Sequence, residues 1–324
     1  MTKIKPVKKS SPKKLNQTKK KTKASSTKKS SAQNSGSPVL KSLIGFCLLV
    51  AIVVTTFFIV HLVFPPEKSE TAFSDYKQFE VFPISEDHSI ADVEPSPVIS
   101  SKLPEIAIII DAVGYNRKIA TRFADLNRNI TFSVLPNSPH KRSIAIKAHR
   151  KGLEIMLHLP MEPFEYPKVN PGPGALLVSM TPNELKTQLR KDIAAIPFVK
   201  GVNNHMGSRM TSLSSKMYQI FTILKEEDLF FIDSKTAPQS LCKPSARLLQ
   251  IPFAERNIFL DHFQTPEAVN RQINALLRRA LKNGRAIGIG HPHKVTFEVL
   301  KERLPEIKSK VKIVHASKLV KTLG

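Results

Sequence analysis

The sequence lacks the residues and motifs that mark several common protein classes. It has only two cysteines in 324 residues, and Cys47 lies in a long apolar segment. Cys242 therefore has no partner in the rest of the chain, which excludes a disulfide framework and a cysteine-based zinc site. The pattern G-x-S-x-G, a Walker phosphate-binding loop and a G-x-G-x-x-G after the first expected strand are also missing. These absences argue against serine hydrolases, nucleotide hydrolases and dinucleotide-dependent enzymes.

Acidic residues are missing from the start of the chain, where the positive charge is concentrated. Residues 1–42 hold 13 of the lysines and no Asp, Glu or Arg, and the formal net charge of the whole chain is +24. The remaining residues carry an excess of about +11, which is modest for a folded domain. Because residues 1–42 contain few apolar side chains, we expect a disordered tail. Lysine runs attract nucleic-acid phosphates, but the next segment favours another explanation, and we expect no nucleic-acid partner.

Residues 43–64 form an apolar run of 22 residues without a formal charge. A helix of that length rises about 33 Å, enough to cross a hydrocarbon core of about 30 Å. A secretory signal would be shorter and would end in a small-residue cleavage site, so the pattern predicts an uncleaved single-pass anchor. Lysines before it and acids after it place the N-terminus in the cytoplasm and the rest of the chain outside. Residues 65–104, rich in Pro, Ser and acids, are predicted to be a linker.

From residue 105 to 324, short apolar runs alternate with helix signals. Thr181 and Glu184 form a capping box, Thr265 precedes a Pro-Glu helix start, and Ser138 precedes Pro139 as a further expected cap. Repeated strand–helix alternation predicts an α/β fold with a parallel sheet, most simply a distorted (β/α) barrel of seven or eight units. An open doubly wound sheet is the alternative. The expected strands are 106–111, 130–136, 153–159, 199–205, 229–233, 257–261, 286–291 and 311–315.

Ionisable and amide side chains follow many of these expected strands. A barrel would gather them on one face, because the carboxyl ends of parallel strands meet at the same end. These residues are Asp111, His158, Glu162, Asn203, Asn204, His205, Asp233, Asp261, His262 and His291.

Three of these positions suggest specific chemistry. His158 and Glu162 combine an imidazole and a carboxylate four residues apart, a usual pair of zinc ligands. Residues 201–211 combine two amides, His205, Ser208 and Arg209, which suit a ligand rich in hydroxyl and carbonyl groups. His291 follows a glycine-containing strand and is a candidate acid or base near neutral pH.

Seven motifs in order make residues 105–322 resemble the divergent polysaccharide deacetylase family, part of the polysaccharide deacetylase (carbohydrate esterase) superfamily. The motifs are IAIIIDAVGYN (106–116), TFSVLP (131–136), GLEIMLHLPMEP (152–163), PGPGAL (171–176), GVNNHMGSRMT (201–211), FFIDSKT (230–236) and AIGIGHPHKVT (286–296). The resemblance implies a distorted (β/α) barrel and a divalent metal, usually zinc, that is held by one Asp and two His. It also implies an Asp base, a His acid and an N-acetylated polysaccharide substrate.

The sequence departs from the superfamily pattern at one expected metal ligand. The superfamily has two adjacent Asp residues after the first strand, and here these positions are Asp111 and Ala112. The resemblance therefore implies a metal site of Asp111, His158 and His205, with His291 as the acid. The base would then be Glu162 or Asp233.

Two functions follow from this comparison. The first is a membrane-anchored, metal-dependent deacetylase of an envelope carbohydrate, with its domain on the outer side of a bacterial inner membrane. Asn203, Asn204, Ser208 and Arg209 would contact the substrate. The second is a domain on the same fold that has lost catalysis and only binds glycan or serves as a scaffold, and the missing carboxylate at Ala112 motivates it.

Overall fold

The computed structural model describes residues 48, 51, 54 and 55 and residues 103–324. The predicted tail (1–42), most of the predicted membrane segment (43–64) and nearly all of the predicted linker (65–104) therefore lie outside the described residues. Among those it describes, no helix is both long enough and apolar enough to cross a bilayer. The membrane anchor remains a prediction from the sequence.

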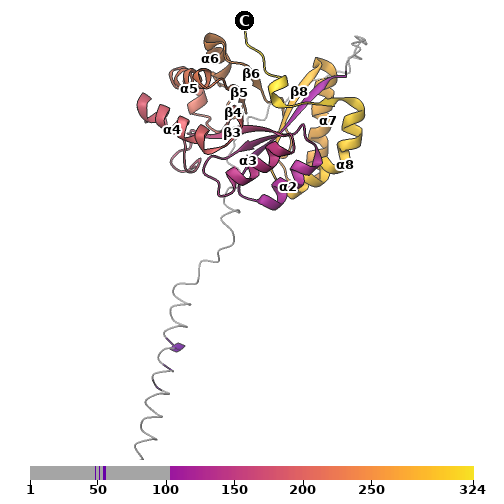
Figure 1. Ribbon diagram of the computed structural model, residues 1–324, viewed down its shortest axis with the longest axis horizontal. Coiled ribbons are helices and arrows are strands. Elements are labelled where there is room, and N and C mark those ends of the chain that lie inside the picture. Colours follow the sequence, from indigo (N-terminus) through magenta and orange to yellow (C-terminus); the bar gives the residue numbers. More distant parts are fainter. Residues whose placement is uncertain (1–47, 49–50, 52–53, 56–102) are drawn as a thin grey trace, which may run out of the picture. The chain divides into compact units, whose positions relative to one another are not determined.

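The domain is built on one parallel sheet of short strands (Figure 1). The strands are β1 (Glu105–Val113), β2 (Thr131–Val134), β3 (Glu154–Met161), β4 (Val199–Met206), β5 (Phe230–Asp233), β6 (Phe253–Glu255), β7 (Ile258–Phe259), β8 (Arg285–Gly290) and β9 (Lys312–Ile313). All expected strands from the sequence are present, and β6 is an additional one.

The strands follow one another in the cyclic order of a barrel. Their order is β6-β5-β4-β3-β2-β1-β8-β7, and β9 also pairs with β1. Because β1 pairs in parallel with both β2 and β8, the last part of the chain returns to the first. Within residues 103–324, the ring is interrupted only between β6 and β7, which do not pair. The fold is therefore a curled, parallel-strand α/β sheet of the barrel type, with an open seam between β6 and β7.

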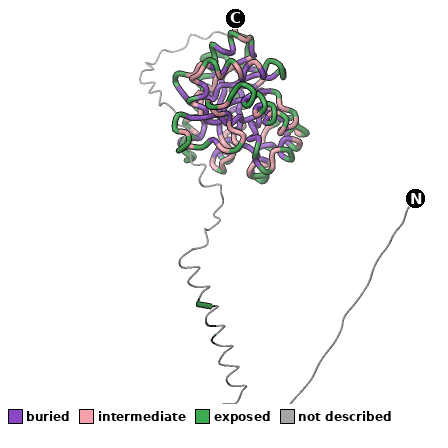
Figure 2. The backbone as a smooth tube through the Cα atoms, turned by 90° about the vertical axis from the view of Figure 1, so that its left-hand side faces the viewer, coloured by how far each residue is buried: buried purple, intermediate pink, exposed green. Residues whose placement is uncertain are grey.

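Seven helices in residues 103–324 pack around the sheet (Figure 1). They are α2 (Arg117–Leu126), α3 (Lys141–Arg150), α4 (Pro182–Ala195), α5 (Ser214–Glu226), α6 (Cys242–Leu249), α7 (Pro266–Asn283) and α8 (Lys294–Lys310). Two 3₁₀ turns, Met210–Ser212 and Ala316–Lys318, complete the described elements. The strands form the buried centre and the helices present exposed outer faces (Figure 2).

The apolar run of β1 has both faces buried, as its lack of alternation predicts. Ile106, Ile108 and Ile110 belong to the large core between the sheet and the helices. Ala107 and Ile109 belong to a second, smaller core inside the barrel. Side chains alternate along a strand, so Asp111 continues the inner series and lies at the carboxyl end of the strand. The strand thus delivers a carboxylate into the barrel mouth.

Two of the three predicted helix starts are confirmed. Thr181 and Glu184 form the reciprocal capping box at α4, and the Thr265 side chain accepts a hydrogen bond from the Ala268 N–H at α7. The prediction for Ser138 is wrong: its hydroxyl donates to the Leu135 carbonyl, and α3 starts only after His140.

The reason is a close approach between two turns that the sequence does not show. A Cβ added to Gly114 would lie 1.8 Å from the Ser138 Oγ, so the turn after β2 packs directly on the turn after β1. The backbone N–H of His140 also donates to the Gly114 carbonyl, at 3.0 Å. Ser138 is therefore held by the β1 turn rather than by the helix that follows it.

Candidate active site

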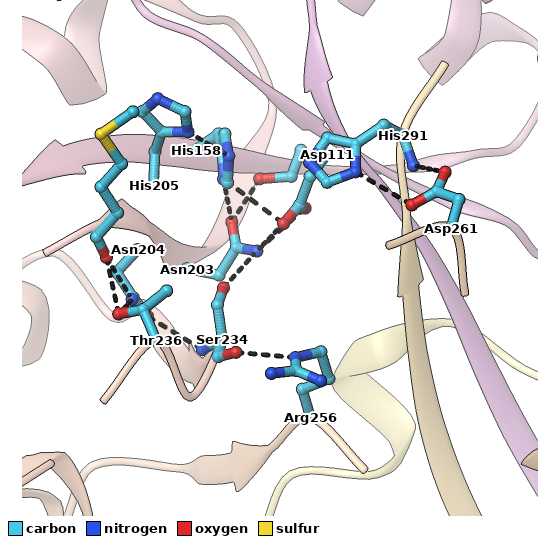
Figure 3. Close-up of polar contacts among 12 residues, drawn as sticks. Asp111, His158, Asn203, Asn204, His205, Ser234, Thr236, Arg256, Asp261 and His291 are labelled. Carbon is cyan, nitrogen blue, oxygen red and sulfur yellow. Dashed lines mark hydrogen bonds and ion pairs between the residues drawn. The ribbon is translucent and has the colours of Figure 1, made fainter. Parts of the chain in front are cut away.

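Polar side chains from four neighbouring strands meet inside the barrel, directly beyond the inner apolar core (Figure 3). Asp111 comes from β1, Ser133 from β2, His158 from β3, and Asn203 and His205 from β4. His158 is in register with Asn203, which places the two side chains on the same face. All five are buried. The inner face of the strands thus changes from apolar to polar at their carboxyl ends.

Asn203 is the centre of this group. Its Nδ2 donates to both carboxylate oxygens of Asp111, at 2.9 Å each, and to the Ser234 hydroxyl at 3.2 Å. Its Oδ1 accepts from the Ser133 hydroxyl at 2.5 Å and lies 3.0 Å from the His158 Nδ1. The amide therefore joins the carboxylate of β1 to the imidazole of β3.

These contacts define the protonation of both buried histidines. The carboxylate of Asp111 accepts hydrogen bonds, so the amide nitrogen of Asn203 faces it and the amide oxygen faces His158. His158 then carries its proton on Nδ1, and its Nε2 accepts from the Nδ1–H of His205 at 3.1 Å. The Nε2 of His205 is left unprotonated, and it is buried without a hydrogen-bond partner in the described part of the chain.

Burial decides the charge states at the site. Desolvation raises the pKa of Asp111 to about 7, although His291 and the Asn203 hydrogen bond both act to lower it. Desolvation also lowers the pKa of His158 to about 3, and it lowers the pKa of His205 well below its ordinary value. Both histidines are therefore neutral at pH 7, in agreement with the hydrogen-bond assignment.

His291 and Asp261 form a second pair at the mouth of the barrel (Figure 3). The Asp261 carboxylate accepts from the His291 backbone N–H at 2.6 Å and from the Thr296 hydroxyl at 2.6 Å, and its Oδ1 lies 3.1 Å from the His291 Nδ1. Burial acts to raise the pKa of Asp261, but His291 and these hydrogen bonds hold it below its ordinary value. An ionised Asp261 thus holds the proton of His291 on Nδ1.

The four residues on which the sequence hypothesis depends come together at one end of the barrel. His158 Nδ1 lies 3.6 Å from the Asp111 carboxylate and His205 contacts His158. His291 follows Gly290, which pairs with Ile110, so it leaves β8 beside Asp111. If these four residues had been on different sides of the domain, they could not have formed one site. Their individual roles remain predictions.

Glu162 and Arg209 form a separate ion pair. The buried Glu162 carboxylate accepts from the Arg209 guanidinium and from the Val178 N–H, at 2.7 Å each. The neighbouring Ser208 hydroxyl accepts from the Phe164 N–H at 3.0 Å. These contacts tie the loop after β3 to the loop after β4, so Glu162 is not part of the group around His158.

Asn204 and Asp233 lie in networks that support the β4 and β5 loops. The Asn204 amide donates to the Met206 carbonyl and accepts from the Ser234 N–H. Asp233 accepts from the Lys235 N–H at 2.7 Å and the Ser240 hydroxyl at 2.6 Å, and burial raises its pKa. Ile232 belongs to the inner core, so the next residue, Asp233, faces the helices.

The sequence did not indicate two residues of the site, Ser133 and Arg256, and it gave no role to a third, Asp261. Ser133 contacts Asn203, Asp261 orients His291, and Arg256 lowers the pKa of Asp111 through its charge. Asp261 was noted only as a polar strand end, and its pairing depends on β7 lying beside β8. Ser133 follows a buried Phe on a short strand, and nothing in the sequence distinguishes it from a core serine.

Two groups of side chains could hold a divalent metal. Ligand atoms of Asp261, His291 and His293 all lie within 4.8 Å of one another. However, Asp261 already accepts three hydrogen bonds from His291 and Thr296, and these explain its position without a metal.

Two histidines of the predicted set, His158 and His205, could also take part in a metal site, whereas Asp111 lies 3.6 Å from the His158 Nδ1, on the protonated side of that ring. The Nε2 of His158 and the Nδ1 of His205 are 3.1 Å apart, which the hydrogen bond between them explains and which is also close to the edge of roughly 3.3 Å expected for two nitrogens bound to zinc at 2.0–2.1 Å. Metal binding through both nitrogens would require His205 to give up its Nδ1 proton or carry it on Nε2 instead. Asn203 accepts the other N–H of His158, as a carbonyl oxygen usually does for a metal-binding histidine. The Nε2 of His205 is buried without a hydrogen-bond partner among the described atoms, so it is a further candidate ligand atom for a metal.

Comparison with known proteins places this chain in one family. Residues 108–320 match the model of the divergent polysaccharide deacetylase family. The chain is 34% identical over 225 residues to the uncharacterized protein YibQ of Escherichia coli K12, covering 69% of each chain. It is 32% identical over 215 residues to an uncharacterized protein of Haemophilus influenzae, covering 66% of this chain and 76% of the other.

A crystal structure of the uncharacterized protein ATU2773 from Agrobacterium tumefaciens C58 is also similar. It has 26% sequence identity and a TM-score of 0.66, with 69% of this chain and 92% of that chain covered. The chain therefore belongs to the divergent polysaccharide deacetylase family, as its motifs indicate.

Proposed function

We propose that this protein is a metal-dependent hydrolase that removes acetyl groups from an N-acetylated polysaccharide of the bacterial envelope. The observation that carries the proposal is the convergence of Asp111, His158, His205 and His291 at one barrel mouth. Membership of the divergent polysaccharide deacetylase family supports the substrate class.

His158, His205 and Asp111 are the residues that would hold the metal. The metal would supply Lewis acidity toward the acetyl carbonyl and would lower the pKa of a water molecule. Asn203 prepares this site, because it holds His158 in the tautomer whose Nε2 carries a lone pair. The lowered pKa values of both histidines keep their rings neutral at pH 7, so each ring retains one nitrogen with a lone pair, which is Nε2 in the assigned tautomers.

His291 would move the proton in both halves of the reaction. With Nδ1–H directed to Asp261, its Nε2 can accept a proton from the water that attacks the acetyl carbon. The same nitrogen can then deliver that proton to the sugar nitrogen as the C–N bond breaks, which yields acetate and a free amine. Asp261 would stabilise the imidazolium that forms between the two transfers.

This assignment differs from a base at Glu162 or Asp233. Glu162 is paired with Arg209, and Asp233 faces Ser240 on the helix side of the sheet. The contacts of these two carboxylates favour roles in supporting the loops. Arg209 is half-exposed and Ser208 lies next to it, so these two predicted residues remain suited to contact sugar hydroxyls at the rim. Asn203 and Asn204, predicted for the same role, are buried.

The membrane anchor at 43–64 would hold the domain at the outer face of the inner membrane, close to an envelope polysaccharide. This part of the proposal depends on the length of the apolar run and on the lysines that precede it.

The test is metal analysis of the purified full-length protein, followed by measurement of acetate release from chitooligosaccharides and peptidoglycan. His291→Gln should lower kcat by at least about 100-fold, the usual contribution of a general acid–base residue. His315→Gln is the matched control, because His315 contacts the Arg128 carbonyl away from the site and should change activity little. If the metal-loaded protein released no acetate, or if both variants behaved alike, the proposal would be rejected.

A second candidate function is glycan binding without turnover. Ala112 favours it, because an Ala occupies the position where the superfamily pattern has a metal-binding Asp. Ala112 has a φ of 50°, a left-handed conformation that Asp tolerates better than most residues. Ala112→Asp should therefore fold, and a gain of both zinc affinity and acetate release would support an enzyme that has lost its activity. Activity in the unchanged protein would exclude this second function.

A further inference from the structure

The open seam of the barrel contains a cavity that is remote from the histidine group. It has a volume of about 350 Å³ and lies between β6, the start of β8 and the C-terminal residues. Arg285 lines it at the beginning of β8, whereas His291 follows the end of the same strand. Six residues of extended strand separate the two positions by about 20 Å, so the cavity is not part of the candidate active site.

The rim of the cavity is positively charged. Lys243, Arg285 and Lys321 line it, and no carboxylate within residues 103–324 pairs with any of the three. Glu255 is the single acidic residue in the lining, and its carboxylate is already paired with Lys235 at 3.2 Å. The lining therefore carries three cationic side chains and one carboxylate, an excess of about two positive charges.

Part of the cavity wall is apolar, and Asn257 and Asn283 add polar groups to the rest of it. Phe253, Ala254, Ile287 and Leu319 contribute to the apolar part, and the last two belong to the apolar core inside the barrel. Because β6 and β7 do not pair, this part of the inner core faces the cavity through the seam. Residues of the C-terminal chain form another edge of the cavity. They are tied to β6 there, because Lys321 and Phe253 exchange two backbone hydrogen bonds of 2.9 and 3.0 Å.

We propose that this seam cavity binds an amphipathic anion, that is, a phosphate or carboxylate attached to a short acyl or aryl group. Arg and Lys supply charge-assisted hydrogen bonds to the anionic head. The apolar wall removes the body of the ligand from water, with a gain that scales with the buried area. A volume near 350 Å³ is at the small end of the range for ligand sites, so it fits a head group with a few carbon atoms. This site is independent of the proposed deacetylase reaction.

Isothermal titration calorimetry of the full-length protein with hexyl phosphate tests the proposal. Inorganic phosphate and hexanol, which each carry half of the ligand chemistry, serve as comparison probes. Hexyl phosphate should bind with one site per chain and at least tenfold more tightly than either probe. Equal affinities for hexyl phosphate and inorganic phosphate, or no saturable binding, would overturn the assignment.

Variants locate the binding to the cavity. Arg285→Gln with Lys321→Gln should weaken hexyl phosphate binding at least tenfold, and both side chains are exposed, so the fold should survive. Arg278→Gln with Lys282→Gln is the matched control, because it removes the same number of exposed charges from α7 outside the cavity. Equal effects of the two double variants would contradict the proposal, and thermal unfolding of each variant verifies its fold.

Competition then distinguishes two sources of the same chemistry. Phosphatidylglycerol vesicles that displace hexyl phosphate from the wild type would identify a lipid head group as the ligand. Hexyl phosphate that stays bound in their presence would identify a free amphipathic anion. Both results retain the site, and the calorimetric comparison above decides whether it exists.

Discussion

The Asn203→Ala substitution should allow both buried histidines to change the ring nitrogen that carries the proton. It removes the acceptor of the His158 Nδ1–H and the donor to both oxygens of Asp111. Each buried group left without its partner costs about 1–3 kcal/mol, so the free energy of unfolding should fall by roughly 2–6 kcal/mol. Metal affinity should also fall by roughly 10- to 100-fold, as it does when the group that orients a metal-binding histidine is removed.

The assay for this prediction is NMR of full-length protein labelled with ¹⁵N-histidine, since two-bond ¹H–¹⁵N correlations distinguish protonated from unprotonated ring nitrogens. In the metal-free wild type, His158 and His205 should both carry their protons on Nδ1. In Asn203→Ala, His158 should populate the Nε2–H tautomer, and its hydrogen bond with His205 should be lost.

Asn204→Ala is the matched control for this experiment. Asn204 is the next residue of β4, it is also an amide that is fully buried, and its hydrogen bonds go to Met206, Ser234 and Thr236 instead. The variant should lose comparable stability and leave both tautomers unchanged. An Nε2–H tautomer of His158 in the wild type, or identical spectra for the wild type and Asn203→Ala, would refute the assignment of the hydrogen bonds.

Two further predictions concern stability. Because burial raises the pKa of Asp111 from 3.8 to about 7, the stability it contributes is complete below about pH 4 and is lost as the pH rises to 7. In Asp111→Asn this pH-dependent loss, on the order of 4 kcal/mol, should be absent. The measurement is the free energy of unfolding in urea at pH 4 and at pH 8. The same pH dependence in the variant and the wild type would contradict the raised pKa. Gly201→Ala should destabilise the fold by about 3 kcal/mol or more, at or above the upper end of the usual cost of overpacking, because the new Cβ would overlap the Phe230 ring. Gly284→Ala, whose Cβ would face open space at a φ of +75°, should cost only about 1–2 kcal/mol in the same urea titration, and equal losses would argue against the Phe230 contact.

The sequence predicted the fold well where the signal is local. Ile106 to Ile110 are apolar without alternation, and this pattern correctly indicated a strand buried on both faces. The Thr181 capping box and the Thr265 cap also depend only on residues within one helical turn. Gly284, which ends α7 in the left-handed conformation, belongs to the same local class.

Local signals failed where a distant segment competes for the same residue. Ser138 has the sequence of a helix cap, but it packs on Gly114, which belongs to another strand end. The three residues of β6 were missed because Phe253–Glu255 is too short to show a pattern and is stabilised by pairing with β5.

For the candidate site, too, the sequence indicated some features and the tertiary structure decided others. The alternation of strands and helices, together with polar residues at strand ends, was enough to indicate that Asp111, His158, His205 and His291 would share one face of a barrel. The chain order alone carries that information, because parallel strands with helical connections direct all their carboxyl ends to one side.

The partners of these residues were decided only by the tertiary structure. Asn203 was expected to contact substrate, but the register of β3 with β4 turns it toward Asp111 and His158. Asp261 orients His291 because β7 lies beside β8, and the seam cavity exists because β6 and β7 do not meet. Hydrogen bonds, desolvation and cavities depend on distances of a few ångströms between segments far apart in the chain, and a linear pattern contains no such distances.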